Sequence, residues 1–233
     1  MTSGEAHGPL GMRRRSEGSI LAVEMPQAAA AQAPQPAPVP ELSRQREPSH
    51  VWRLEGATWA DFQRLLELRG DRPVPRFAYL EGTLEIMSPS RSHEHIKSMI
   101  GRLIEAWCSE HGIDVMPYGS WLLESKTHRR GIEPDECYVV GEVTDPDVPD
   151  LAIEVVWSSG GLDKLDIYHK LRVREVWYWM DEKLHLYALR GNGYEPLAQS
   201  EVLPGLDHEQ LLRYVDFLSV TKAVKEYRVA LRG

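Results

Sequence analysis

The sequence contains an apolar run, Leu151-Ala152-Ile153-Glu154-Val155-Val156, with a single charged side chain inside it. The aliphatic residues on both sides of Glu154 predict a buried β-strand, where an unpaired charge costs free energy. A second acidic residue, Asp135, directly precedes another predicted strand at residues 136–140. Each carboxylate therefore needs either a cationic partner or a function.

The polar segment between these two strands, residues 141–150, predicts an antiparallel hairpin. If the loop closes symmetrically, Asp135 lies opposite Val156, one pleat from Glu154. Two carboxylates at that separation repel unless a divalent cation lies between them, and Mg²⁺ is commonly held by one or two carboxylates together with phosphate and water. The pattern therefore favours Asp135 and Glu154 as ligands of Mg²⁺ or Mn²⁺. The alternatives are a turn cap for Asp135 and an arginine ion pair for Glu154.

The rest of the chain predicts a mixed order of helices and strands. Helices are predicted at residues 58–70, 93–112, 163–171, 208–214 and 220–231. Further strands are predicted in a hairpin at 76–87 that turns at Glu81-Gly82, at 115–118, 121–124, 176–180 and 183–189, and shortly after residue 193. This order is typical of an α/β or α+β protein with a mixed sheet flanked by helices, here in one domain at residues 49–233.

Residues 1–48 have a different composition, with alternating Ala and Pro, and predict a disordered leader. This segment has five basic and five acidic residues, whereas the whole chain has 27 basic and 35 acidic ones. The excess of eight negative charges therefore belongs to the domain. An acidic body weakens the case for broad duplex binding, which depends on many Lys and Arg contacts to phosphate.

The two cysteines, Cys108 and Cys137, lie in apolar runs and predict buried free thiols in a reducing compartment. No stretch approaches the roughly twenty apolar residues of a membrane span. The run after Arg13-Arg14-Arg15 is interrupted by Glu24 and Pro26, which argues against a secretory signal. We therefore expect a cytoplasmic protein that makes no membrane contact.

Several motifs in a fixed order resemble the Uma-type restriction endonuclease family of the PD-(D/E)XK nuclease superfamily. They are Glu81-Gly82, Ile86-Met87-Ser88-Pro89, His93, Pro134-Asp135, residues 149–156, Lys164-Leu165, Tyr168 and residues 176–181. The resemblance extends from about Ala78 to Leu206. It implies a restriction-endonuclease-like fold in which Asp135 and Glu154 hold the metal ion.

The resemblance also implies a catalytic lysine. The superfamily pattern places it two residues after the glutamate, where this chain has Val156. Lys164, near the start of the next predicted helix, is then the best candidate because its long side chain can reach back to the strand. Lys170 is the rival, but it lies about 9 Å further along the helix axis.

Two other residues are candidates for supporting roles. Glu81 is either an outer metal ligand or a general base, and otherwise an ordinary turn residue. His93 can hydrogen-bond a carboxylate or carry a proton. His93 and His95 also suggest zinc, although residues two apart on a helix point to different sides.

Two further groups have both a structural and a functional interpretation. Trp177 and Trp179 share one face of a predicted strand, so core packing is favoured over base stacking. The basic run His128-Arg129-Arg130 is either a solvated turn or a phosphate clamp.

The implied function is a Mg²⁺- or Mn²⁺-dependent endonuclease that hydrolyses DNA phosphodiester bonds with metal-activated water. Asp135 and Glu154 hold the metal, Lys164 stabilises charge, and Glu81 and His93 assist. The implied partner is DNA, and a homodimer is expected by analogy with the superfamily. The alternative is a binding or scaffold protein on a degenerate nuclease fold, favoured by Val156 and by the acidic body.

Overall fold

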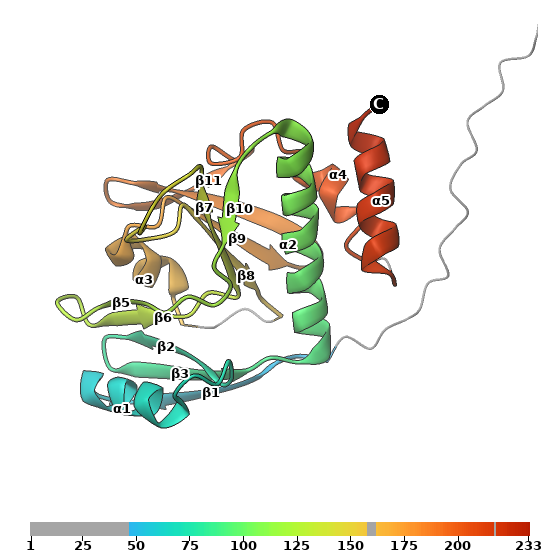
Figure 1. Ribbon diagram of the computed structural model, residues 1–233. Coiled ribbons are helices and arrows are strands. Elements are labelled where there is room, and N and C mark those ends of the chain that lie inside the picture. Colours follow the sequence, from blue (N-terminus) through green and yellow to red (C-terminus); the bar gives the residue numbers. More distant parts are fainter. Residues whose placement is uncertain (1–46, 158–161, 217) are drawn as a thin grey trace, which may run out of the picture. The chain divides into compact units, whose positions relative to one another are not determined.

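The strands of the protein form two sheets in the computed structural model, which describes residues 47–157, 162–216 and 218–233 (Figure 1). The first sheet has the strand order β1 (His50–Glu55), β3 (Thr83–Ser88), β2 (Arg76–Leu80), β6 (Arg130–Ile132) and β5 (Leu123–Ser125). The second has the order β11 (Gly193–Leu197), β10 (Lys183–Arg190), β9 (Glu175–Met180), β8 (Leu151–Val155), β7 (Glu136–Val140) and β4 (Val115–Pro117). The expected leader lies outside the described residues except for Glu47 and Pro48.

Five helices flank these sheets in the described chain, and all five were predicted. They are α1 (Trp59–Arg69), α2 (Arg91–His111), α3 (Lys164–Leu171), α4 (His208–Leu212) and α5 (Val220–Leu231). Helix α2 begins two residues before the predicted start because the side chain of Ser90 caps it, and it ends at Gly112, whose left-handed backbone stops it. In Figure 1, α2 crosses the second sheet, α5 lies beside α2, and α1 lies against the first sheet.

The mixed α/β class is confirmed, although the strands divide between two sheets. Strands β8 and β9 are parallel and are joined by α3, whereas every other described strand pair is antiparallel. This β8–α3–β9 unit places the start of α3 beside the carboxyl end of β8, which is the usual place for a site in such a unit.

Strands β1 and β6 were not predicted. The sequence of β1, HVWRLE, does not alternate strictly between apolar and polar residues, and the prediction depended on such alternation. All six residues of β1 are exposed. Strand β6 has only three residues, and it is held in an extended conformation by its pairing with β2 and β5. The run His128-Arg129-Arg130 thus ends inside a sheet.

The register of β7 and β8 corrects the predicted pairing. Glu136 is paired with Ile153, so one further step places Asp135 opposite Glu154 and not opposite Val156. The loop is asymmetric because the carboxylate of Asp150 accepts a hydrogen bond from the Val140 amide at 2.9 Å, in place of a backbone partner on β8.

The larger hydrophobic core lies between α2 and the second sheet. Trp177 and Trp179 are both buried in it, which confirms that they pack in the core. Cys108 and Cys137 are buried free thiols, as predicted, and burial raises their pKa to about 11 and about 12. Among the described helices, none is both long and apolar enough to cross a membrane.

We predict that Gly131→Ala in β6 lowers the free energy of unfolding by about 1–3 kcal/mol, because there is no room for a larger side chain. A Cβ at this position would meet the Phe62 ring of α1, with Cε1 at 2.5 Å. Urea denaturation measures the effect. Gly191→Ala is the matched control, since its Cβ would have no neighbour within 4 Å. Equal stability of the two variants would contradict the close packing of α1 on β6.

Candidate functional site

Two buried carboxylates face each other on neighbouring strands. Asp135 directly precedes β7 and Glu154 is the fourth residue of β8, and neither side chain is exposed. Because opposite residues of an antiparallel pair share a face, both carboxylates point to the same side of the second sheet. The structure therefore brings together the two acidic residues that the sequence favoured as metal ligands.

The Asp135 carboxylate is surrounded by donors from three other elements. Its Oδ1 accepts a hydrogen bond from Arg76 Nη1 and lies 2.9 Å from His93 Nε2, and its Oδ2 accepts a hydrogen bond from the Val155 amide at 2.7 Å. Burial by itself raises the pKa of Asp135, but the interaction with His93 and the positive charge of Arg76 outweigh burial and hold this pKa well below its usual range. Asp135 is therefore ionised.

Arg76 and His93 are themselves held in place. Arg76 is buried at the start of β2, and its Nη2 also donates to Glu94 Oε1 at 2.7 Å. His93 lies in the first turn of α2 without solvent exposure, and its Nδ1 is 3.1 Å from Ser49 Oγ. The first sheet and α2 thus both contribute to the site. Arg76 was not a predicted site residue.

The Glu154 carboxylate is bonded to two residues of α3. Lys164 Nζ donates to its Oε2 at 2.6 Å, and the Tyr168 hydroxyl donates to its Oε1. Lys164 and Tyr168 are four residues apart, so they lie on one face of the helix. Lys164 is thus bonded to one of the two carboxylates, whereas Lys170 makes no hydrogen bond or ion pair with either carboxylate in the described chain.

The buried ionisable side chains of the site shift one another's pKa. Burial raises the pKa of Glu154 and the neighbouring Asp135 charge raises it further, which together outweigh the opposing effects of Lys164 and Tyr168. Burial alone lowers the pKa of Lys164, but the charges of Glu154, Asp135 and Glu85 raise it above its usual range. Lys164 is therefore a firmly charged ammonium group.

The structure does not place Glu81 beside the two buried carboxylates. Its side chain is 70% exposed at the β2–β3 turn and accepts a hydrogen bond from Arg130 Nη2 at 2.8 Å. The same nitrogen of Arg130 lies 3.0 Å from Asp166 of α3, and Arg130 is buried. Arg130 therefore joins the first sheet to α3, and it is neither in a solvated turn nor free to clamp a phosphate.

Glu85 of β3 is the acidic residue that faces Lys164 in place of Glu81. Its side chain is only 7% exposed, and it accepts a hydrogen bond from Arg53 Nε at 3.1 Å. Sequence reasoning missed it, although the signal was present: Glu85 lies between apolar residues of a predicted strand, just as Glu154 does.

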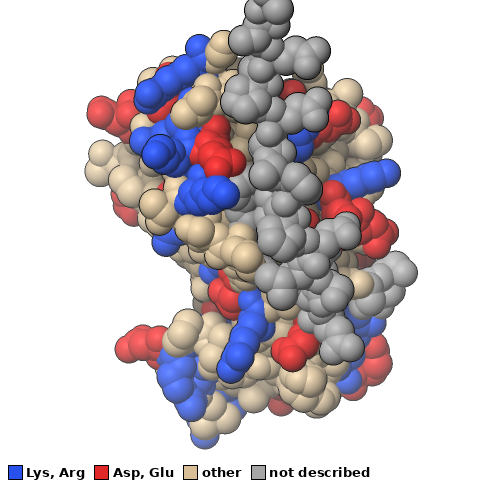
Figure 2. All heavy atoms as spheres, turned by 90° about the vertical axis from the view of Figure 1, so that its right-hand side faces the viewer, with Lys and Arg blue, Asp and Glu red and all other residues tan. Residues whose placement is uncertain are grey.

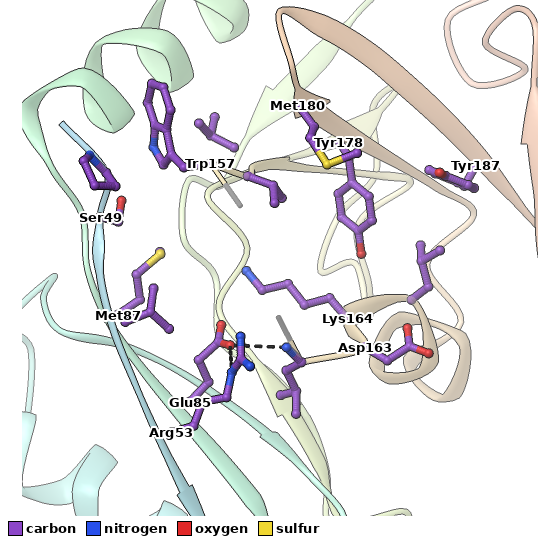
Figure 3. A pocket seen from close by; sticks show the side chains of 16 residues that line it. Ser49, Arg53, Glu85, Met87, Trp157, Asp163, Lys164, Tyr178, Met180 and Tyr187 are labelled. Carbon is purple, nitrogen blue, oxygen red and sulfur yellow. Dashed lines mark hydrogen bonds and ion pairs between the residues drawn. The ribbon is translucent and has the colours of Figure 1, made fainter. Parts of the chain in front are cut away.

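A cavity of about 370 Å³ lies beside these charges. Its walls come from β1, β3, β9, β10, the end of β8 and the start of α3 (Figure 3). Lys164 and Glu85 line it, whereas Asp135 and Glu154 do not. Because Lys164 lines the cavity and also bonds Glu154, it links the open space with the buried carboxylates.

The donor chemistry of the site fits a magnesium-type ion. Two carboxylates are a common protein contribution to Mg²⁺ coordination, with water and phosphate supplying the rest. The described residues contain no group of three or more His, Cys, Asp and Glu side chains that could hold a metal. An ion here would therefore take its other ligands from water and from a bound phosphodiester. The zinc alternative is not supported, since both ring nitrogens of His93 already contact Ser49 and Asp135.

We predict that Arg76→Met lowers the free energy of unfolding by about 3–5 kcal/mol, because it removes a cation from a buried carboxylate. Urea denaturation at neutral pH measures this. The control is Arg64→Met, which breaks only the exposed pair with Glu67 and should cost less than about 1 kcal/mol. A comparable small loss in both variants would show that Asp135 does not depend on Arg76.

The chain is similar to one protein family and to solved structures. Residues 59–221 match the model of the Uma2 family, described as "putative restriction endonuclease". One similar solved structure is that of "a putative nuclease belonging to DUF820" from Anabaena variabilis, with 17% sequence identity, a TM-score of 0.44, and coverage of 74% of this chain and 99% of that chain. No curated protein matches the chain. The family match includes both carboxylates and Lys164, and the chain belongs to the Uma2 restriction endonuclease family.

Proposed function

We propose that this protein hydrolyses phosphodiester bonds of DNA in a reaction that requires Mg²⁺ or Mn²⁺. The observation that carries the proposal is the opposed pair of buried carboxylates, one of which is bonded to a lysine that also lines a cavity. Family membership supports the same chemistry.

Asp135 and Glu154 would hold the ion in this proposal. When bound, a divalent ion polarises a phosphate oxygen and lowers the pKa of water. Arg76, His93 and the Val155 amide fix the orientation of the Asp135 carboxylate. Because His93 is fully buried, its role here is positioning and not proton exchange with solvent.

Lys164 is the group that changes partners. In the free protein its Nζ is bonded to Glu154, and its side chain lines the cavity. A phosphodiester in the cavity offers Nζ a second anionic acceptor, so the ammonium group can stabilise the charge that develops on the phosphate oxygens. Tyr168 keeps its hydrogen bond to the other Glu154 oxygen and holds that carboxylate in place.

Glu85 takes the supporting role that was expected of Glu81. It lies in the cavity with Lys164, and its partner Arg53, which is exposed, lines the same cavity. A carboxylate in this position can accept a proton from an attacking water molecule.

We predict that Lys164→Met lowers the rate of DNA nicking in Mn²⁺ at least about 100-fold, because it removes a preorganised charge from the phosphate. A fluorescently labelled oligodeoxynucleotide assay measures the rate. Lys170→Met, a lysine on the same helix without a bond to Glu154, should keep the wild-type rate. Loss of activity in both variants, or in neither, would contradict the assignment of Lys164, and a wild-type protein without nicking activity would contradict the proposed function.

A binding or scaffold protein is the second candidate, and one observation favours it. All four oxygens of the two carboxylates already have a donor from the protein. If these donors never leave, a metal ion has to share the carboxylate oxygens with them.

Calorimetric titration with Mn²⁺ in the presence of a short oligodeoxynucleotide separates the two candidates. For the nuclease, we expect saturable binding that is lost in Asp135→Asn, because the ion needs this carboxylate. The variant's fold is checked by circular dichroism. Identical heats for the wild-type protein and a folded Asp135→Asn variant would favour the scaffold.

A further inference from the structure

We infer that the cavity beside Lys164 receives one unstacked nucleotide, so that the preferred substrate is a single strand and not an intact duplex. This inference rests on the proposed function for its chemistry at Lys164. It adds a substrate form, which neither the carboxylate pair nor the family match specifies.

The walls of the cavity are suited to a nucleobase. Tyr178 of β9 and Tyr187 of β10 are neighbours, with ring centroids 5.7 Å apart and planes inclined by 59°. In Figure 3 the Tyr178 ring extends into the cavity with its hydroxyl towards Lys164. Met180 and Met87 add polarisable apolar surface. Aromatic and thioether groups of this kind bind the flat face of a base regardless of its sequence.

The charged end of the cavity is suited to the phosphate of the same nucleotide. Arg53 and Lys164 both line it, from β1 and from the start of α3. Glu85 lies between them, bonded to Arg53 and acting electrostatically on Lys164 (Figure 3). A nucleotide with its base against the tyrosines would therefore present its phosphate to Lys164, the residue proposed to act on it.

A base-paired nucleotide reaches this position only at a cost in free energy. The cavity lies between strands of the two sheets, with β1 and β3 on one side and β8 to β10 on the other. A base in a duplex is stacked and paired, and it enters a cavity of this kind only when it is flipped out of the helix. A single strand has no such cost, because its bases are already accessible.

The overall charge argues against binding over a broad duplex surface. The net charge is −8, and basic and acidic side chains are interspersed on the part of the face in Figure 2 that described residues form. Duplex binding depends on a broad set of phosphate contacts, whereas single-strand binding gains about 1–3 kcal/mol from each stacked base. The acidic charge therefore weakens the duplex mode, and the aromatic cavity supplies the stacking contacts of the single-strand mode.

Binding of a short oligodeoxynucleotide that carries one fluorescent adenine analogue tests this inference. The full-length protein is titrated without divalent ions, so that no cleavage occurs, first with the single strand and then with the same strand in a duplex. We expect saturable binding and a fluorescence change with the single strand, and affinity for the duplex at least about tenfold weaker because flipping costs a few kcal/mol. Equal or tighter duplex binding overturns the inference, as does a failure to bind the single strand.

Two tryptophan substitutions on β1 provide the matched variants. Val51 lines the cavity and is 45% exposed, and Leu54, 48% exposed, does not line it and lies on the other face of the strand. Val51→Trp should fill the cavity and weaken single-strand binding at least about fivefold, the low end of the contribution of one stacked base. Leu54→Trp should bind like the wild-type protein, and equal affinities of the two variants overturn the inference.

Cleavage assays separate this inference from the proposed function. Single-strand binding in the cavity without any nicking in Mn²⁺ contradicts the proposed function and leaves the binding site intact. Efficient nicking of a duplex that is unaffected by Val51→Trp supports the function and overturns the inference.

Discussion

The mutual repulsion of two buried carboxylates is the constraint on which this structure depends. Asp135 and Glu154 lie opposite each other without solvent, so their charges must be balanced by cations from elsewhere in the fold. The balance comes from both sides: Arg76 reaches Asp135 from the first sheet, and Lys164 reaches Glu154 from α3. These ion pairs tie the two sheets and α3 to one point.

The same balance connects stability with function. The pair of Arg76 and Asp135 is fully enclosed, whereas Lys164 lines a cavity and has Glu85 as a second acidic neighbour. Lys164 is therefore the member of the group that a ligand in the cavity could reach, whereas Arg76 is buried beside Asp135. A nuclease and a degenerate scaffold with this fold differ in whether Lys164 leaves Glu154 when an anionic ligand arrives.

Much of the fold could be predicted from local patterns. Helix α2 follows from its apolar periodicity with Ser90 and Gly112 at its ends, and the turn at Glu81-Gly82 follows from Gly82, which adopts positive φ without strain. Local patterns could not predict β6, because a three-residue strand is ordered by its neighbours. The pairing of Asp135 was predicted two residues away from the observed one, since the hydrogen bond from the Val140 amide to the Asp150 side chain makes the loop asymmetric.

The sequence by itself determined which groups need explanation: a glutamate inside an apolar strand, an aspartate before its neighbour, and a lysine within reach. Only the tertiary structure decided their partners. Arg76 and Asp135 are 59 residues apart, and Glu85, not Glu81, lines the cavity together with Lys164. Burial and charge identify a residue locally, whereas the compensation of a buried charge depends on segments that become neighbours only when the chain folds.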